Sequence, residues 1–181
     1  NIYDDTFNIE ADALVTKSPN IILGILTADC APVLIQDPLK NIIAAVHIGW
    51  KGAFSKILEK TIVSLNDLGA DVNDLKLAIG PCIGPESYEV GHDLYIKFTK
   101  ENIINKKFFK ATRLNKFKFN LPKYIYSQAE SIGIQTNNIS NSDIDTFKDR
   151  KNFFSYRRNF TNKLNDCGRM ISAISMNIQN D

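Results

Sequence analysis

The sequence contains little cysteine and little histidine, with three and two of them respectively in 181 residues. Three widely spaced cysteines do not form a disulfide framework, so we expect a reducing cytoplasm as the compartment. Two histidines are far fewer than the copper clusters of a multicopper oxidase need, which argues against that class of enzyme. Because no apolar run approaches the roughly 20 residues of a membrane helix, we expect no membrane partner.

A large excess of charge of one sign is also absent. The chain has 22 basic and 20 acidic residues, and 44% of its residues are apolar. This balance is ordinary for one globular domain, here residues 1–181, and does not suggest nucleic acid as a partner. Residues 106–118 depart from it, with six basic residues, no acidic one and interleaved phenylalanines. Such a segment could bind nucleic acid through phosphate contacts and stacking, but we favour a solvated surface segment because the rest of the chain balances the charge.

Several nucleotide-binding and metal-binding signatures are missing. The sequence has no P-loop and no glycine-rich dinucleotide fingerprint. The zinc signature of the cytidine deaminases needs His-x-Glu and Pro-Cys-x-x-Cys. Here His47 is followed by Ile48 and Gly49, and Pro85 stands where a second cysteine would follow Cys82. These absences direct attention to other residues.

Short apolar runs bounded by glycine, proline and aspartate predict buried strands, and apolar residues at three- and four-residue steps predict helices. The predicted strands are residues 13–16, 21–27, 33–35, 42–46, 75–79, 153–158 and 168–176, and the predicted helices are residues 54–68, 92–100 and 120–132. Gly69 and Gly133 stand where C-terminal caps belong, and Asn120 where an N-cap belongs. We interpret residues 1–12 as a solvated N-terminal segment.

Cys30 and His47 each follow an apolar run, and a turn at Asp37 and Pro38 sends the chain back between them. We therefore expect the two side chains to meet at one edge of a sheet. Thiolate and imidazole together suit zinc, and Cys30 could equally be a nucleophile with His47 as its base. The alternative is that neither residue is reactive, with Cys30 as a buried structural cysteine and His47 as a hydrogen-bonded histidine. We take Cys30, His47 and the adjacent Asp29 as candidate catalytic residues, and Cys30 and His47 as candidate metal ligands.

Three further residues are candidates for substrate binding. Trp50 follows His47 closely, in a glycine-flanked segment. Arg157 and Arg158 could bind a phosphate or carboxylate. Because neighbouring side chains of a strand point to opposite faces, at most one of these arginines should face a given site. A surface role for both arginines is an equal alternative.

Six segments, in order along the chain, resemble the signature blocks of the YfiH family, which was long labelled laccase-domain or polyphenol oxidase. They read ADALVT (residues 11–16), ADCAPV (28–33), HIGWKG (47–52), IGPCIG (79–84), YEVG (88–91) and FFSYRR (153–158). The resemblance implies an α+β fold, a single layered α/β domain with a large mixed β-sheet flanked by helices. It also implies a zinc-dependent purine nucleoside phosphorylase that acts on adenosine, inosine or methylthioadenosine, with adenosine deaminase as a side activity.

The resemblance further implies a zinc ion held by two histidines and one cysteine. Cys30 matches the cysteine ligand and His47 the second histidine. The first histidine lies upstream of the ADALVT block, so we expect this chain to lack an N-terminal portion. The sequence departs from the family pattern at Lys51, where arginine is usual, at Asp145, where a Cys-Thr pair is usual, and at Cys167, which replaces a common threonine.

Two other functions compete with the phosphorylase. A metal-free cysteine hydrolase, of the peptidoglycan-editing type attached to some relatives, would use Cys30 as nucleophile. Such a nucleophile should be alkylated readily and should be insensitive to chelators. A non-catalytic remnant or binding module is the third hypothesis, and the missing zinc ligand favours it.

Overall fold

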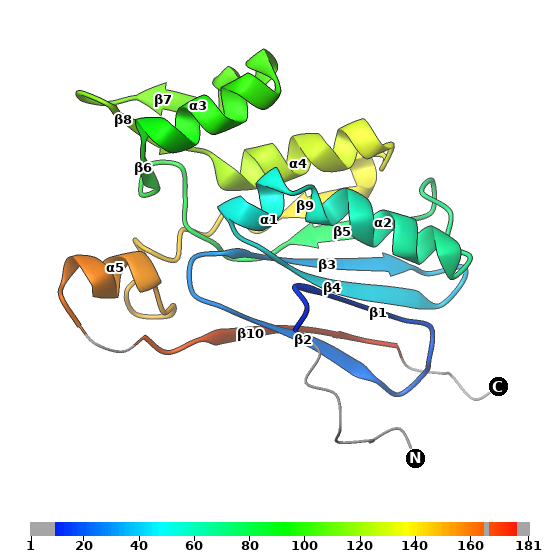
Figure 1. Ribbon diagram of the computed structural model, residues 1–181. Coiled ribbons are helices and arrows are strands. Elements are labelled where there is room, and N and C mark those ends of the chain that lie inside the picture. Colours follow the sequence, from blue (N-terminus) through cyan, green and yellow to red (C-terminus); the bar gives the residue numbers. More distant parts are fainter. Residues whose placement is uncertain (1–9, 165–166, 177–181) are drawn as a thin grey trace.

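The computed structural model describes residues 10–164 and 167–176 (Figure 1). The largest sheet has five strands in the order β1-β4-β3-β5-β9. Their bounds are β1 Ala13–Thr16, β3 Ala31–Asp37, β4 Ile42–Ile48, β5 Lys76–Ile79 and β9 Ile139–Asn141. Strand β9 runs parallel to β5, and the other neighbours are antiparallel. The sheet is therefore mixed, as the family resemblance implied.

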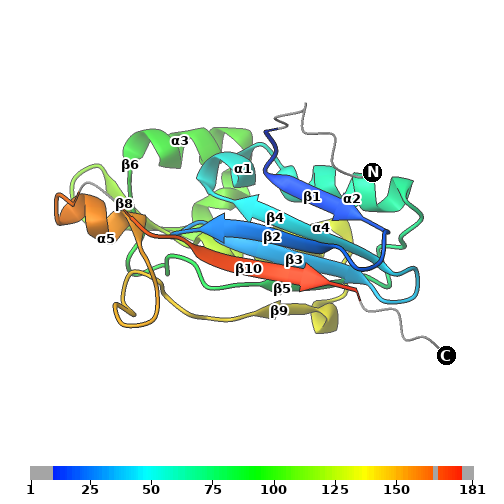
Figure 2. The same ribbon diagram turned by 90° about the horizontal axis from the view of Figure 1, so that it is seen from below.

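The large sheet is covered on both faces. Helices α1 (Trp50–Phe54), α2 (Ile57–Asp67) and α4 (Leu121–Ile132) lie on one face, and the two-stranded sheet of β2 (Ile22–Thr27) and β10 (Met170–Ser175) lies against the other (Figures 1 and 2). Ile43 and Ala45 of β4 pack with β2, whereas Ala44 and Val46 belong to the core on the helix side. A strand covered on both faces needs apolar residues at successive positions, which explains the continuous apolar run of β4.

Asp37 holds the hairpin that joins β3 to β4. Its side chain is buried, and Oδ1 accepts hydrogen bonds from the backbone N–H groups of Leu39 and Lys40, both at 2.9 Å. Its other oxygen accepts from the N–H of Asp71 at 3.1 Å, which connects the hairpin to the loop after α2. The hairpin sets the antiparallel register of β3 and β4, in which Pro32 pairs with His47.

A third sheet, β6-β8-β7, forms a lobe with α3 and the 3-10 helix η1. The bounds are β6 Glu89–Gly91, α3 His92–Glu101, η1 Ile103–Phe108, β7 Phe109–Ala111 and β8 Lys116–Phe119. Phe117 stacks on Tyr95 with ring centroids 4.1 Å apart, and Phe109 stacks on Phe119 at 4.6 Å. The phenylalanines of the basic segment thus pack on other rings within the lobe, which supports a structural hairpin rather than a stacking surface for bases.

The structure corrects two of the predicted elements. The helix predicted at residues 54–68 is α2, which begins only at Ile57 because Lys56 adopts a left-handed conformation with φ 59°, and the residues before it form the separate short helix α1. The strand predicted at residues 153–158 is wrong. Ser155 instead caps α5 (Tyr156–Thr161), its hydroxyl accepting from the N–H of Arg158 at 3.1 Å. The strand-based argument about the two neighbouring arginines therefore does not apply.

Other elements lie where the pattern placed them. Asn120 caps α4 by accepting from the N–H of Lys123 at 3.0 Å, and Gly133 ends that helix with φ 110°. The sequence pattern did not predict the short strands β6, β7, β8 and β9 or the 3-10 helix η2 (Thr136–Asn138). Within the described residues, no helix combines the length and the apolar character that crossing a bilayer requires.

Candidate functional site

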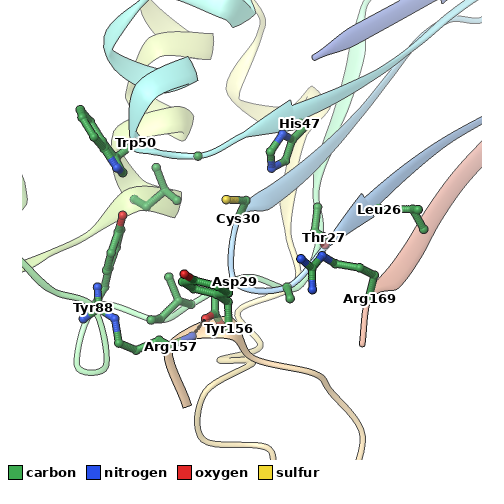
Figure 3. Close-up of a pocket in the computed structure, with 14 residues that line it drawn as sticks. Leu26, Thr27, Asp29, Cys30, His47, Trp50, Tyr88, Tyr156, Arg157 and Arg169 are labelled. Carbon is green, nitrogen blue, oxygen red and sulfur yellow. Dashed lines mark hydrogen bonds between the residues drawn. The ribbon is translucent and has the colours of Figure 1, made fainter. Parts of the chain in front are cut away.

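A cavity of about 410 Å³ lies at the end of the sheet where the β2–β3 loop, the end of β4 and α5 meet (Figure 3). Of the six predicted site residues, five line it, and only Arg158 does not. In Figure 3, Cys30, His47 and Arg169 lie on one side of the cavity, and Trp50 and Tyr88 lie on the other. The complete lining is Leu26, Thr27, Ala28, Asp29, Cys30, His47, Gly49, Trp50, Ile83, Tyr88, Leu121, Tyr156, Arg157 and Arg169.

The register of β3 and β4 brings Cys30 and His47 together. Ala31 pairs with Ile48 and Pro32 with His47, so the next residue before β3, Cys30, lies opposite Gly49. A Cβ atom built on Gly49 would lie only 2.9 Å from the Cys30 sulfur. Glycine at this position therefore leaves the sulfur its room beside the end of β4. The expectation that Cys30 and His47 meet at one edge of a sheet is confirmed.

The thiol of Cys30 is held in its protonated form. Burial raises the pKa of this thiol to about 11, with smaller contributions from the negative charges of Asp29 and Asp12, and the Arg169 guanidinium acts in the opposite direction. A thiol with this pKa is almost entirely un-ionised at neutral pH, and it becomes an effective ligand or nucleophile only when something removes its proton.

His47 has a partner that the sequence analysis missed. Its Nδ1 lies 2.9 Å from Oδ1 of Asp12, and its backbone N–H donates to the carbonyl oxygen of Asp12 at 2.7 Å. Because a carboxylate oxygen accepts, Nδ1 carries a proton in this contact, and Nε2 is the nitrogen left for the cavity. Asp12 is exposed, as expected for a solvated N-terminal segment, but its contacts with His47 were not predicted; residues 1–9 lie outside the described residues.

Asp29 is a buried connection between distant parts of the chain. Its Oδ1 accepts from the Thr146 hydroxyl at 2.7 Å. Its Oδ2 accepts from the Ser155 hydroxyl at 2.9 Å and from the N–H of Arg157 at 2.6 Å. Asp29 also adopts a left-handed backbone conformation with φ 86°, which aspartate tolerates better than most residues. These contacts tie the loop carrying Cys30 to the start of α5.

The two neighbouring arginines have different surroundings. Arg157 faces the cavity, where its guanidinium lies 5.4 Å from the ring centroid of Tyr88 and donates to the carbonyl of Glu89 at 2.6 Å. Arg158 donates to three carbonyl oxygens, those of Thr146 and Phe147 at 2.9 Å and of Phe153 at 2.6 Å. Arg158 therefore holds a loop in place, and Arg157 is the one in position to meet a ligand.

Sequence reasoning missed three other residues of the cavity, Arg169, Tyr88 and Tyr156. Arg169 comes from the segment leading into β10, and it donates to the carbonyl groups of Cys167 and Gly168. Burial raises the pKa of Tyr88 to about 12, so its phenol stays protonated. Tyr88 and Tyr156 lie within two of the family blocks, which is the one signal that could have found them, and Arg169 lies in none of the six blocks.

Cys30 and His47 are of the types that zinc prefers as ligands. Among the described residues, no group of three or more His, Cys, Asp or Glu side chains could hold a metal ion. The sulfur has room beside Gly49, and Nε2 of His47 is free of the Asp12 contact. The pair therefore fits zinc as two members of a ligand set, which would need further donors.

A family model described as multi-copper polyphenol oxidoreductase laccase matches residues 2–177. The chain belongs to this family. The description associates the family with a metal, although this chain's two histidines are few for a multicopper cluster. The YfiH resemblance is confirmed by a solved structure, the YfiH protein of Bacillus licheniformis, with a TM-score of 0.83 and 29% identity over 91% of this chain and 61% of that one.

Curated relatives are named purine nucleoside phosphorylase. One from Haemophilus influenzae is 35% identical over 92% of this chain and 65% of its own length. One from Rickettsia conorii is 34% identical over 83% of this chain and 62% of its own length. The chain thus spans less than two thirds of these relatives.

Proposed function

We propose that this chain carries the catalytic cavity of a zinc-dependent purine nucleoside phosphorylase. The observation that carries the proposal is one cavity whose lining includes Cys30 and His47 together with the cationic side chains of Arg157 and Arg169. A thiolate and an imidazole suit zinc, and guanidinium groups suit phosphate. The names of the curated relatives point to the same substrates, a purine nucleoside and phosphate.

Cys30 and His47 would hold the zinc ion, His47 through Nε2. Bound zinc would supply a Lewis acid or an activated water, and the second of these would account for deamination of adenosine to inosine. The positive charge of the ion would also favour the thiolate of Cys30, whose proton is otherwise tightly held.

Arg157 and Arg169 would bind phosphate in this proposal, and Trp50 and Tyr88 would contact the purine through their rings. In phosphorolysis, a phosphate oxygen forms a bond to the anomeric carbon of the ribose while the bond to the purine nitrogen breaks. The electron pair of the broken bond leaves with the purine, which takes up a proton. Asp29 and Arg158 would serve as positioning residues, because their polar atoms are engaged by the protein itself.

Product analysis tests the proposal. The full-length natural protein is incubated with phosphate and adenosine, inosine or methylthioadenosine, with and without zinc, beside Cys30→Ser. We expect free purine and ribose 1-phosphate, lost in the variant, with inosine from adenosine as a minor product. A zinc-loaded protein that forms no purine product would overturn the proposal.

The phosphate contacts are tested separately. Arg157→Ala and Arg169→Ala should each raise the KM for phosphate at least tenfold, with a smaller effect on the KM for nucleoside. Arg158→Ala removes a guanidinium from the same helix that does not line the cavity, and the KM for phosphate of its folded fraction should rise less than that of either of the first two variants. Normal phosphate dependence in both of the first two variants would remove these arginines from the proposal.

One observation favours a metal-free cysteine hydrolase as the second candidate. In this candidate, Cys30 would be the nucleophile, His47 its base, and Asp12 the carboxylate that orients the base, which is the set of groups that such enzymes use. The high pKa of the Cys30 thiol weighs against this candidate. Hydrolase activity that persists in the presence of chelators and is lost on alkylation of Cys30 would favour the cysteine hydrolase over the phosphorylase.

A further inference from the structure

Asp12 lies directly before β1, and the pairing of β1 with β4 sets its place. Ala13 pairs with Val46, so the preceding residue, Asp12, lies opposite His47. The backbone contact between His47 and Asp12, at 2.7 Å, continues this antiparallel pairing. It uses only main-chain atoms, and it therefore holds Asp12 in place whatever its side chain.

The carboxylate of Asp12 makes a second contact, with the ring of His47, at 2.9 Å between Oδ1 and Nδ1. The neutral imidazole has two tautomers, and only the one with its proton on Nδ1 can donate in this contact. The contact also restricts rotation of the ring, because the backbone pairing fixes the main chain of the residue that carries Oδ1. Both effects leave the lone pair of Nε2 available to the cavity.

We propose that Asp12 is the positioning residue that keeps His47 in the Nδ1–H tautomer with Nε2 presented to the cavity. Its effect on zinc rests on the proposed function, in which His47 is a zinc ligand. Partners of this kind orient ligating histidines and raise their basicity, and their loss typically weakens metal binding about 10- to 100-fold.

The exposure of the pair makes a clean test possible. The side chains of Asp12 and His47 are 60% and 35% exposed, so the contact adds little to the stability of the fold. Removal of the Asp12 carboxylate should therefore change the tautomer and the orientation of the His47 ring and leave the sheet intact. Glu10 provides a matched control, since it is an exposed acidic residue two positions away.

The experiment compares wild type with Asp12→Ala, Asp12→Asn and Glu10→Ala. In the metal-free protein at fixed pH, ¹⁵N NMR of the imidazole nitrogens reports the tautomer of His47, with His92 as an internal reference. We expect Nδ1–H in wild type and Glu10→Ala, a mixture of tautomers in Asp12→Ala, and partial rescue in Asp12→Asn, which keeps an acceptor oxygen. An unchanged tautomer in Asp12→Ala would overturn the inference.

The second measurement is the affinity for Zn²⁺, obtained by competition with a chromophoric chelator. Absorption of bound Co²⁺ reports whether the thiolate is a ligand. We expect Asp12→Ala to bind Zn²⁺ about 10- to 100-fold more weakly than wild type and Glu10→Ala. Equal Zn²⁺ affinity in wild type and Asp12→Ala would overturn the role of Asp12 in metal binding. If wild type keeps the Nδ1–H tautomer but binds no Zn²⁺, the zinc-dependent function fails while the positioning of His47 by Asp12 stands.

Discussion

Replacement of Asp29 distinguishes a carboxylate that positions the site from one that takes part in proton transfer. Asp29→Ala removes the acceptor from the Thr146 and Ser155 hydroxyls and from the Arg157 N–H. The hydroxyls can rotate toward other partners, but the N–H cannot. Loss of these bonds and the strain of alanine at φ 86° together amount to roughly 5 kcal/mol. This is a large part of the ~5–15 kcal/mol that stabilises a typical domain.

Asp29→Asn should be far milder. The amide oxygen can take the place of Oδ2, which faces the Ser155 hydroxyl and the Arg157 N–H. The amide nitrogen then faces the Thr146 hydroxyl, which can rotate to accept a hydrogen bond. Asparagine also tolerates the left-handed backbone conformation. We expect a loss of about 1–2 kcal/mol, mainly from weaker hydrogen bonds to a neutral group.

Urea unfolding and phosphorolysis rates are the assays. If Asp29 only positions the loop and α5, folded Asp29→Asn should keep its kcat within about tenfold of wild type. A general base loses about 10²- to 10⁴-fold when it is neutralised. A well-folded Asp29→Asn protein with a loss of that size would refute our assignment and restore the catalytic role that the sequence suggested.

Three further predictions concern the same end of the sheet. Gly49→Ala should displace the Cys30 sulfur, because the new Cβ would lie 2.9 Å from it. Titration with Co²⁺ should show weaker metal binding by the variant, with little change in Tm. An affinity for Co²⁺ equal to that of wild type would contradict this prediction. Arg158→Ala should lower stability by about 3 kcal/mol in urea unfolding, since three carbonyl groups lose a charged donor; a loss below about 0.5 kcal/mol would count against it. In the metal-free protein, Cys30 should react with iodoacetamide at pH 8 about 100-fold more slowly than an ordinary thiol, because its raised pKa leaves little thiolate at that pH. The rate should rise toward pH 11, and peptide mass mapping identifies the labelled cysteine. Fast labelling of Cys30 at pH 8 would favour the cysteine hydrolase.

The sequence alone was enough to bring Cys30 and His47 together. Two apolar runs joined by a short turn can pair in few antiparallel registers, and each of these residues stands at the outer end of its run. Helix α4 was equally predictable from the sequence, since its asparagine cap, its apolar periodicity and its final glycine are all local features. Such features depend on residues a few positions apart, which a linear pattern records directly.

The contacts that define the cavity depended on tertiary structure. Asp12 meets His47 only because β1 pairs with β4, and Arg169 reaches the cavity only because β10 pairs with β2. The segment at residues 153–158 has a strand-like composition, yet Asp29 accepts from the Ser155 hydroxyl and from the N–H of Arg157 and so supports a helix start there. Each of these outcomes joins residues far apart in the chain. Local propensity contains no information about such partners, because burial and hydrogen bonding across elements override it.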